Sequence, residues 1–168
     1  MSDWLIFVFL SKKRMDFYHN ILKPSHSGLR WAVLGLLIWA IINAARSMSS
    51  GKYEKKDKMI NLFTMVSLHV QFLFGLILLL TNNNGKVSYA AGWMANSLNR
   101  FFGLEHVLLM IIAITLITIG RRKAEKKLEG TRNKHRAILI SYTIGLIIIL
   151  ASIPWPFGPW ASFGGGLG

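Results

Sequence analysis

Histidine is the residue type in this sequence best suited to chemistry, because an imidazole can bind a metal, donate a hydrogen bond or accept one. His69 lies in the middle of the apolar segment 61–80, and Gln71 and Gly75 follow it closely. An imidazole at that depth in a membrane helix costs free energy unless it has a partner or a ligand. The sequence therefore predicts that other helices surround this segment and that His69 faces a ligand or a polar group.

A second histidine lies at a similar height. His69 is ten residues from the start of a predicted span at 59, and His106 is five residues from the start of one at 101. At ~1.5 Å per residue, the two lie ~15 Å and ~8 Å from opposite membrane faces, within ~6 Å of each other in height. Two imidazoles on facing helices are what axial ligation of a haem iron requires. This spacing suggests a b-type haem with His69 and His106 as axial ligands. Hydrogen bonding between helices, for example from His69 to Glu105, accounts for the same residues without a cofactor.

Four further side chains are candidates for the same site or its surroundings. His26 lies near the height of His106 and is an alternative axial ligand, a partner of a haem propionate, or a helix cap. Arg30, one turn further along, suits a propionate because guanidinium pairs bidentately with carboxylates, although it could also extend towards lipid headgroups. Glu105 suggests a proton or quinone role, or an ion pair with Arg30 or Arg100. His135 is interpreted as an interfacial residue, with a second haem site as the alternative.

The elements that must position these residues are four apolar segments. They predict an all-α fold, an integral membrane four-helix bundle with short loops, with spans at about 28–45, 59–80, 101–120 and 137–153. The membrane domain is expected to cover residues 25–157. Residues 1–24 form an N-terminal arm that could lie at the membrane interface, and residues 158–168 form an uncharged tail rich in aromatic residues and glycine.

Charge indicates orientation rather than a nucleic-acid partner. The chain carries a formal net charge of +13, but the basic residues gather between the apolar segments. Five lie in residues 46–58 and eight in residues 121–136, whereas residues 81–100 carry two. By the positive-inside rule, both basic loops face the cytoplasm and both termini face outward. The chain has no cysteine, which excludes disulfides, thiolate ligands and c-type haem attachment.

Six short motifs are spread along residues 15–157. They are His26-Ser-Gly-Leu-Arg30-Trp31, His69-Val-Gln71 with Gly75, Arg100-Phe-Phe-Gly-Leu-Glu105-His106, Ile117-Thr-Ile-Gly120, Lys134-His135-Arg136 and Ile153-Pro-Trp-Pro-Phe157. Together they resemble a family of small bacterial four-span membrane proteins labelled cytochrome b-like. The resemblance implies b-type haem and electron transfer, with His26, His69, His106 and His135 as the positions that would carry haem.

Three functions are compatible with this sequence. The first is a membrane b-type haem protein in electron transfer, with quinone as a candidate partner and a respiratory complex as a candidate parent assembly. It would be an electron-transfer protein rather than a stand-alone enzyme. The second is a cofactor-free accessory subunit that packs against other membrane subunits in the lipid bilayer. The third, a transition-metal site of His26, His69, Glu105 and His106, is less attractive because these residues lie at scattered depths.

Overall fold

The fold is formed by four helices that are each long and apolar enough to cross a membrane. The structure is a computed structural model, and it describes residue 13 and residues 17–81 and 87–155. The four spans cover Asn20–Ser47, Lys55–Thr81, Ser97–Lys126 and Thr131–Ser152. Three of the predicted spans lie within these helices, and the fourth ends one residue beyond the last helix. The prediction of an all-α four-helix architecture is confirmed, and the described residues contain no strand.

Short irregular turns extend or interrupt two of the spans. The first consists of the π-helical turn η1 (Tyr18–Leu22) and α2 (Lys23–Ser47), and the second is α3 (Lys55–Thr81). After the short 3₁₀ turn η2 (Trp93–Ala95), the third span runs through α4 (Ser97–Arg100), the π-helical turn η3 (Phe101–Glu105) and α5 (His106–Lys126). The fourth span is α6 (Thr131–Ser152). Single π-helical turns are frequent at functional sites, and one of them ends directly before His106.

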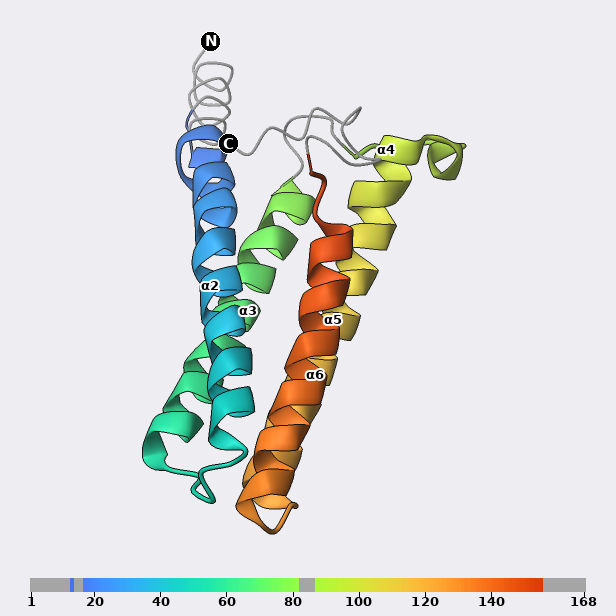
Figure 1. Ribbon diagram of the computed structural model, residues 1–168. Coiled ribbons are helices and arrows are strands. Elements are labelled where there is room, and N and C mark those ends of the chain that lie inside the picture. Colours follow the sequence, from blue (N-terminus) through green and yellow to red (C-terminus); the bar gives the residue numbers. More distant parts are fainter. Residues whose placement is uncertain (1–12, 14–16, 82–86, 156–168) are drawn as a thin grey trace.

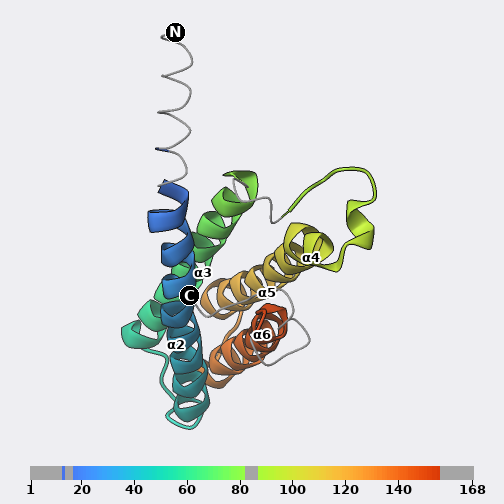
Figure 2. The same ribbon diagram turned by 90° about the horizontal axis from the view of Figure 1, so that it is seen from above.

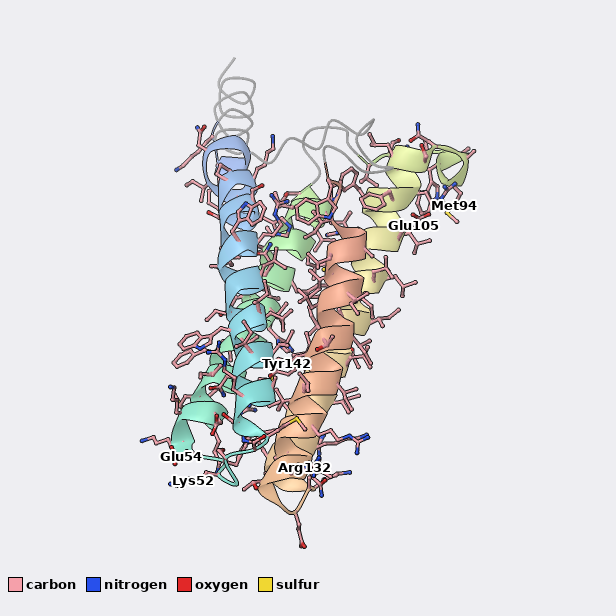
Figure 3. All side chains as sticks on the ribbon, in the orientation of Figure 1. Lys52, Glu54, Met94, Glu105, Arg132 and Tyr142 are labelled. Carbon is pink, nitrogen blue, oxygen red and sulfur yellow. The ribbon has the colours of Figure 1, made fainter. Side chains whose placement is uncertain are left out.

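The two basic loops lie at the same end of the bundle. Figure 1 shows the α2–α3 and α5–α6 connections together at the bottom, whereas α4 lies at the top. The labelled side chains follow the same division: Lys52, Glu54 and Arg132 lie at one end, and Met94 and Glu105 at the other (Figure 3). Below, the end with the basic loops is called the basic end and the other the outer end. The predicted arm and tail fall largely on residues 1–12, 14–16 and 156–168, outside the described residues.

The helices pack as two antiparallel pairs that join through α2 and α6. α5 and α6 make the most extensive contact, α2 packs on both α3 and α6, and α3 meets α5 less closely. Figure 2 shows the two pairs from above. Glycine allows the close approach of α5 and α6, since a Cβ at Gly145 would lie 2.7 Å from the Cδ1 atom of Ile117. Small residues at such contacts are a common feature of membrane helix packing.

The core is apolar, and so are the outward faces. Buried residues at its centre include Leu37, Ala40, Ile117 and Ile138. Many large apolar side chains are exposed on the outside of the helices, for example Phe63, Leu73 and Ile147. Such a surface suits a lipid bilayer, in which apolar side chains need no burial inside the protein.

A polar network ties the helices together near the basic end. The Tyr142 hydroxyl, inside the bundle in Figure 3, donates to the Asn61 carbonyl oxygen at 2.9 Å. The Asn61 side-chain amide donates to the Tyr53 hydroxyl at 3.2 Å, and that hydroxyl donates to Glu125 at 2.6 Å. The network thus joins α6, α3, the α2–α3 loop and the end of α5.

Candidate functional site

A cavity of about 540 Å³ lies among the four helices, in the half of the bundle near the outer end. This volume is in the range of small-molecule and cofactor sites. Most of the lining is apolar, with side chains such as Val33, Leu68, Met110 and Ile149. The lining also includes His26, Arg30, Gln71 and His106, together with Ser27 and Lys23. A mostly apolar cavity with a few convergent polar groups is the usual form of a binding site.

Helical spacing explains why these residues meet. His26 and Arg30 are four residues apart on α2, and Gln71 and Gly75 are four residues apart on α3, so each pair shares one face of its helix. α2 and α3 pack against each other, and the two faces border the same cavity. His106 reaches the cavity from the first position of α5.

His106 has a defined hydrogen bond to the neighbouring helix. Its Nδ1 atom lies 2.9 Å from the carbonyl oxygen of Ser152, near the end of α6. A carbonyl oxygen can only accept, so Nδ1 carries the proton and donates it. In a neutral imidazole the Nε2 atom then keeps its lone pair. This is the arrangement found in metal-binding histidines, in which the bond from one nitrogen orients the ring and the other nitrogen binds the metal.

In His26, by contrast, the Nδ1 atom accepts a hydrogen bond instead of donating one. The Gln71 Nε2 atom lies 2.8 Å from the His26 carbonyl oxygen and 3.2 Å from the His26 Nδ1 atom. The carbonyl oxygen fixes the amide orientation, because only the NH₂ group of Gln71 can donate to it. The same NH₂ group therefore donates to Nδ1, and in a neutral His26 the proton lies on Nε2.

Gly75 provides the space in which the His26 ring lies. A Cβ atom at Gly75 would lie 3.0 Å from the Cε1 atom of His26 and 3.5 Å from its Nδ1 atom. The ring therefore rests on the backbone of α3, and a larger residue at position 75 would have to displace it.

Arg30 brings positive charge to the cavity. Its Nε and one terminal nitrogen are buried and have no hydrogen-bond partner in the described part of the chain. The guanidinium carbon lies 5.3 Å from the centre of the Trp31 ring, and Trp31 in turn contacts Trp155 with ring centres 6.2 Å apart. Unpaired buried guanidinium N–H groups favour an acceptor such as a carboxylate.

His69 does not line this cavity, contrary to the expected pairing with His106. Its side chain is exposed on the outside of α3, and its Nδ1 atom lies 2.8 Å from the Met65 carbonyl oxygen of the same helix. At 3.6 residues per turn, two residues rotate the helix by about 200°, so His69 and Gln71 point to opposite sides. The prediction placed His69 by its depth along the helix, but depth does not determine which side of the helix a side chain faces. The structure brings together His26 and His106 instead.

The two secondary candidates also lie outside the cavity lining. Glu105 forms an ion pair with Arg100, with 2.7 Å between Oε1 and Nε, and this was one of the expected pairings. His135 is buried at the basic end, where its Nε2 atom donates to the Lys52 carbonyl oxygen at 2.9 Å. Its ring also contacts Tyr53, with ring centres 5.0 Å apart. His135 therefore connects α6 to the α2–α3 loop.

The loop residue Tyr53 has a raised pKa. Burial raises its pKa well above the ordinary value, and the hydrogen bond to the Glu125 carboxylate raises it further. Both effects keep the hydroxyl protonated, so Tyr53 acts as a donor at neutral pH.

The outer end of the cavity is bordered by the segment before α4. Val87 is buried and lines the cavity, and a Cβ atom at Gly103 would lie 2.9 Å from its Cγ1 atom. The backbone N–H of Ser88 donates to the Asn99 side chain at 3.2 Å, and the Tyr89 hydroxyl donates to the Gly103 carbonyl oxygen at 3.4 Å. These contacts attach the segment to α4 and η3.

Sequence reasoning missed two features of the site. Ser152 contributes a backbone carbonyl oxygen, which no residue type signals. No specific role was assigned to Gln71 from the sequence, although its amide determines the state of His26. Among the described residues, no group of three histidine, aspartate or glutamate side chains could hold a metal ion, so the four-residue transition-metal site, already the least attractive alternative, finds no support.

No protein-family model matches this chain, and neither does a curated protein or a solved structure. The resemblance to the cytochrome b-like family therefore remains an expectation.

Proposed function

We propose that this protein binds b-type haem in the outer cavity and transfers electrons within the membrane, and that His106 would hold the haem iron. The observation that carries the proposal is the His106–Ser152 hydrogen bond. It orients the imidazole and leaves the Nε2 lone pair for a metal, inside a mostly apolar cavity of about 540 Å³. Histidine is the common protein ligand of haem iron, and helical bundles often hold such cofactors.

Arg30 adds an independent reason. Haem carries two propionate carboxylates, and the buried guanidinium of Arg30 has N–H groups without partners in the described structure. Arg30 would hold a propionate by charge-assisted hydrogen bonds. The apolar side chains of the lining would exclude water from the macrocycle. When bound, the haem supplies the one-electron chemistry, and the chain supplies the ligand, the charge and the low-polarity surroundings.

The proposed location is a bacterial inner membrane, which the family resemblance implies, with both termini in the periplasm, as the basic loops indicate. The cavity then lies in the periplasmic half of the bilayer. Quinol is the proposed electron donor, because it is a reductant that dissolves in the membrane.

A second candidate function is that of an accessory subunit in a larger membrane complex, such as a respiratory complex. One observation favours it. His69 presents its Nε2 atom to the outside of the bundle at mid-membrane depth, where a polar group normally contacts protein rather than lipid. A helix of a partner subunit would supply the protein contact for His69, with or without haem in the cavity.

The haem proposal is tested by the reduced-minus-oxidised absorption spectrum of the purified protein. We expect the spectrum of bound haem in the wild type and in His69→Ala, and its loss in His106→Ala. His69→Ala is the matched control, because it also removes one imidazole from a membrane helix but does not alter the cavity lining. A wild-type protein that shows no spectrum of bound haem after addition of haem would leave the accessory-subunit function as the better explanation.

A further inference from the structure

His26 and His106 face the same cavity in complementary states. His106 has an Nδ1–H bonded to Ser152 and therefore a free lone pair on Nε2. His26 accepts at Nδ1 from Gln71 and therefore has an N–H on Nε2. A metal needs a lone pair, so only one of these two imidazoles is prepared for ligation.

Gln71 and Gly75 together hold the His26 ring in this tautomer and position. Gln71 binds both the backbone carbonyl and the ring of the same residue, at 2.8 Å and 3.2 Å, so its amide cannot turn without losing the shorter bond. The ring also lies against the backbone at Gly75. For His26 to offer a lone pair on Nε2, Nδ1 would have to carry a proton that points at the Gln71 NH₂ group. Two donors would then oppose each other.

Arg30 lies one helical turn from His26 and faces the same cavity. Its buried N–H groups and the His26 Nε2–H thus form a set of donors on α2. Such a set favours an oxygen atom with negative charge. The ligand that fits this cavity therefore has one end that accepts a lone pair from α5 and another end that carries an anionic oxygen towards α2.

From this arrangement we infer that His26 is a hydrogen-bond donor to the anionic oxygen of the ligand, together with Arg30, and not an axial ligand of the metal. The inference rests on the proposed function, for which the ligand is haem and the oxygen belongs to a propionate. It selects one of the three roles that the sequence leaves open for His26, namely that of a propionate partner.

The test uses the full-length protein in detergent, reconstituted with haem b, and two variants of His26. His26→Leu removes the donor, whereas His26→Gln keeps an N–H donor but no imidazole. Electron paramagnetic resonance of the ferric protein reports the axial ligands through the spin state, and haem titration reports affinity. We expect the same spin state in the wild type and both variants. Haem affinity should fall by about tenfold in His26→Leu and by less than about threefold in His26→Gln, since one hydrogen bond to a charged group is lost only in the first.

Three outcomes would overturn the inference. A low-spin wild type that becomes high-spin in both variants would identify His26 as an axial ligand, and the proposed function would survive. An unchanged haem affinity in His26→Leu would show that His26 makes no bond to the ligand. A wild-type protein that takes up no haem would overturn the proposed function, and this inference with it. His26→Gln keeps the test decisive if His26→Leu fails to fold, because glutamine cannot replace an imidazole ligand.

Discussion

The His26 ring lies against Gly75 so closely that an added Cβ atom would come within 3.0 Å of its Cε1 atom. This contact sets the position of the ring between α2 and α3. Gly75→Ala should therefore displace the ring by a few tenths of an ångström and weaken its bond to Gln71. We expect haem affinity to fall several-fold in this variant, as measured by haem titration.

Gly35→Ala is the matched control for this prediction. Gly35 lies on α2, and nothing lies within 4 Å of a Cβ atom added there. Alanine is a better helix former than glycine by about 1 kcal/mol, so both substitutions gain helix propensity but only one meets the ring. Equal haem affinity in the two variants would show that the Gly75 contact does not matter for binding.

Arg30 should influence the midpoint potential of a bound haem. Reduction adds negative charge, which a nearby guanidinium stabilises, so Arg30→Gln should lower the potential. For a unit charge at ~10 Å and an effective dielectric constant of ~20, the effect is about 1.7 kcal/mol, or about 70 mV for one electron. Potentiometric titration measures the shift. Arg30→Lys keeps the charge and should stay near the wild-type value, and a wild-type potential in Arg30→Gln would place the charge elsewhere.

Tyr53 should make stability depend on pH in the alkaline range. Its pKa is raised in the folded protein, so the unfolded chain loses this proton at lower pH than the native state does. The contribution of the protonated hydroxyl is then complete below about pH 10, the ordinary pKa of tyrosine, and is lost as pH rises towards the raised value.

Unfolding of the purified protein in detergent, followed by circular dichroism at several pH values, measures this effect. Tyr53→Phe should be less stable than the wild type at neutral pH, because Glu125 and Asn61 lose their partner. The difference should shrink above pH 10. A difference that stays constant across pH would mean that Tyr53 does not titrate in this range.

Orientation can be measured directly because the chain has no cysteine of its own. Single cysteines at Lys56, Lys127 and Ser88 can be treated with a membrane-impermeant thiol reagent in intact cells. Lys56 lies in the first turn of α3 and Lys127 directly after α5, both beside the basic loops, whereas Ser88 lies in the segment before α4. We expect labelling of Ser88→Cys alone. Labelling of Lys56→Cys and Lys127→Cys with protection of Ser88→Cys would reverse the proposed topology.

The number and approximate bounds of the four spans could be predicted from the sequence, since the length of an apolar run is a one-dimensional property. The direction of each side chain could not. α3 is apolar nearly all round, as expected for a helix that meets lipid on one side and protein on the other, so its pattern does not mark an inward face. His69 was therefore assigned to the centre of the bundle although it lies on the outside.

The residues of the cavity were only partly predictable for a related reason. His26, Arg30 and His106 stood out because charged and polar side chains are rare in spans. The protonation states of the two histidines depend on the Gln71 amide and the Ser152 carbonyl oxygen. Every residue has a carbonyl group, and only the packing of α5 against α6 selects this one.

The position of the cavity along the bundle has an electrical consequence. His26 and His106 lie in the first third of the spans Asn20–Ser47 and Ser97–Lys126, counted from the outer end. With the basic loops in the cytoplasm, an electron that enters and leaves from the periplasmic side crosses only a minor part of the membrane field. Moving one charge across the whole bilayer costs about 2.3 kcal/mol per 100 mV, so this exchange would cost less than half of that amount. Redox turnover at this cavity would be nearly non-electrogenic, and its rate would respond weakly to the membrane potential.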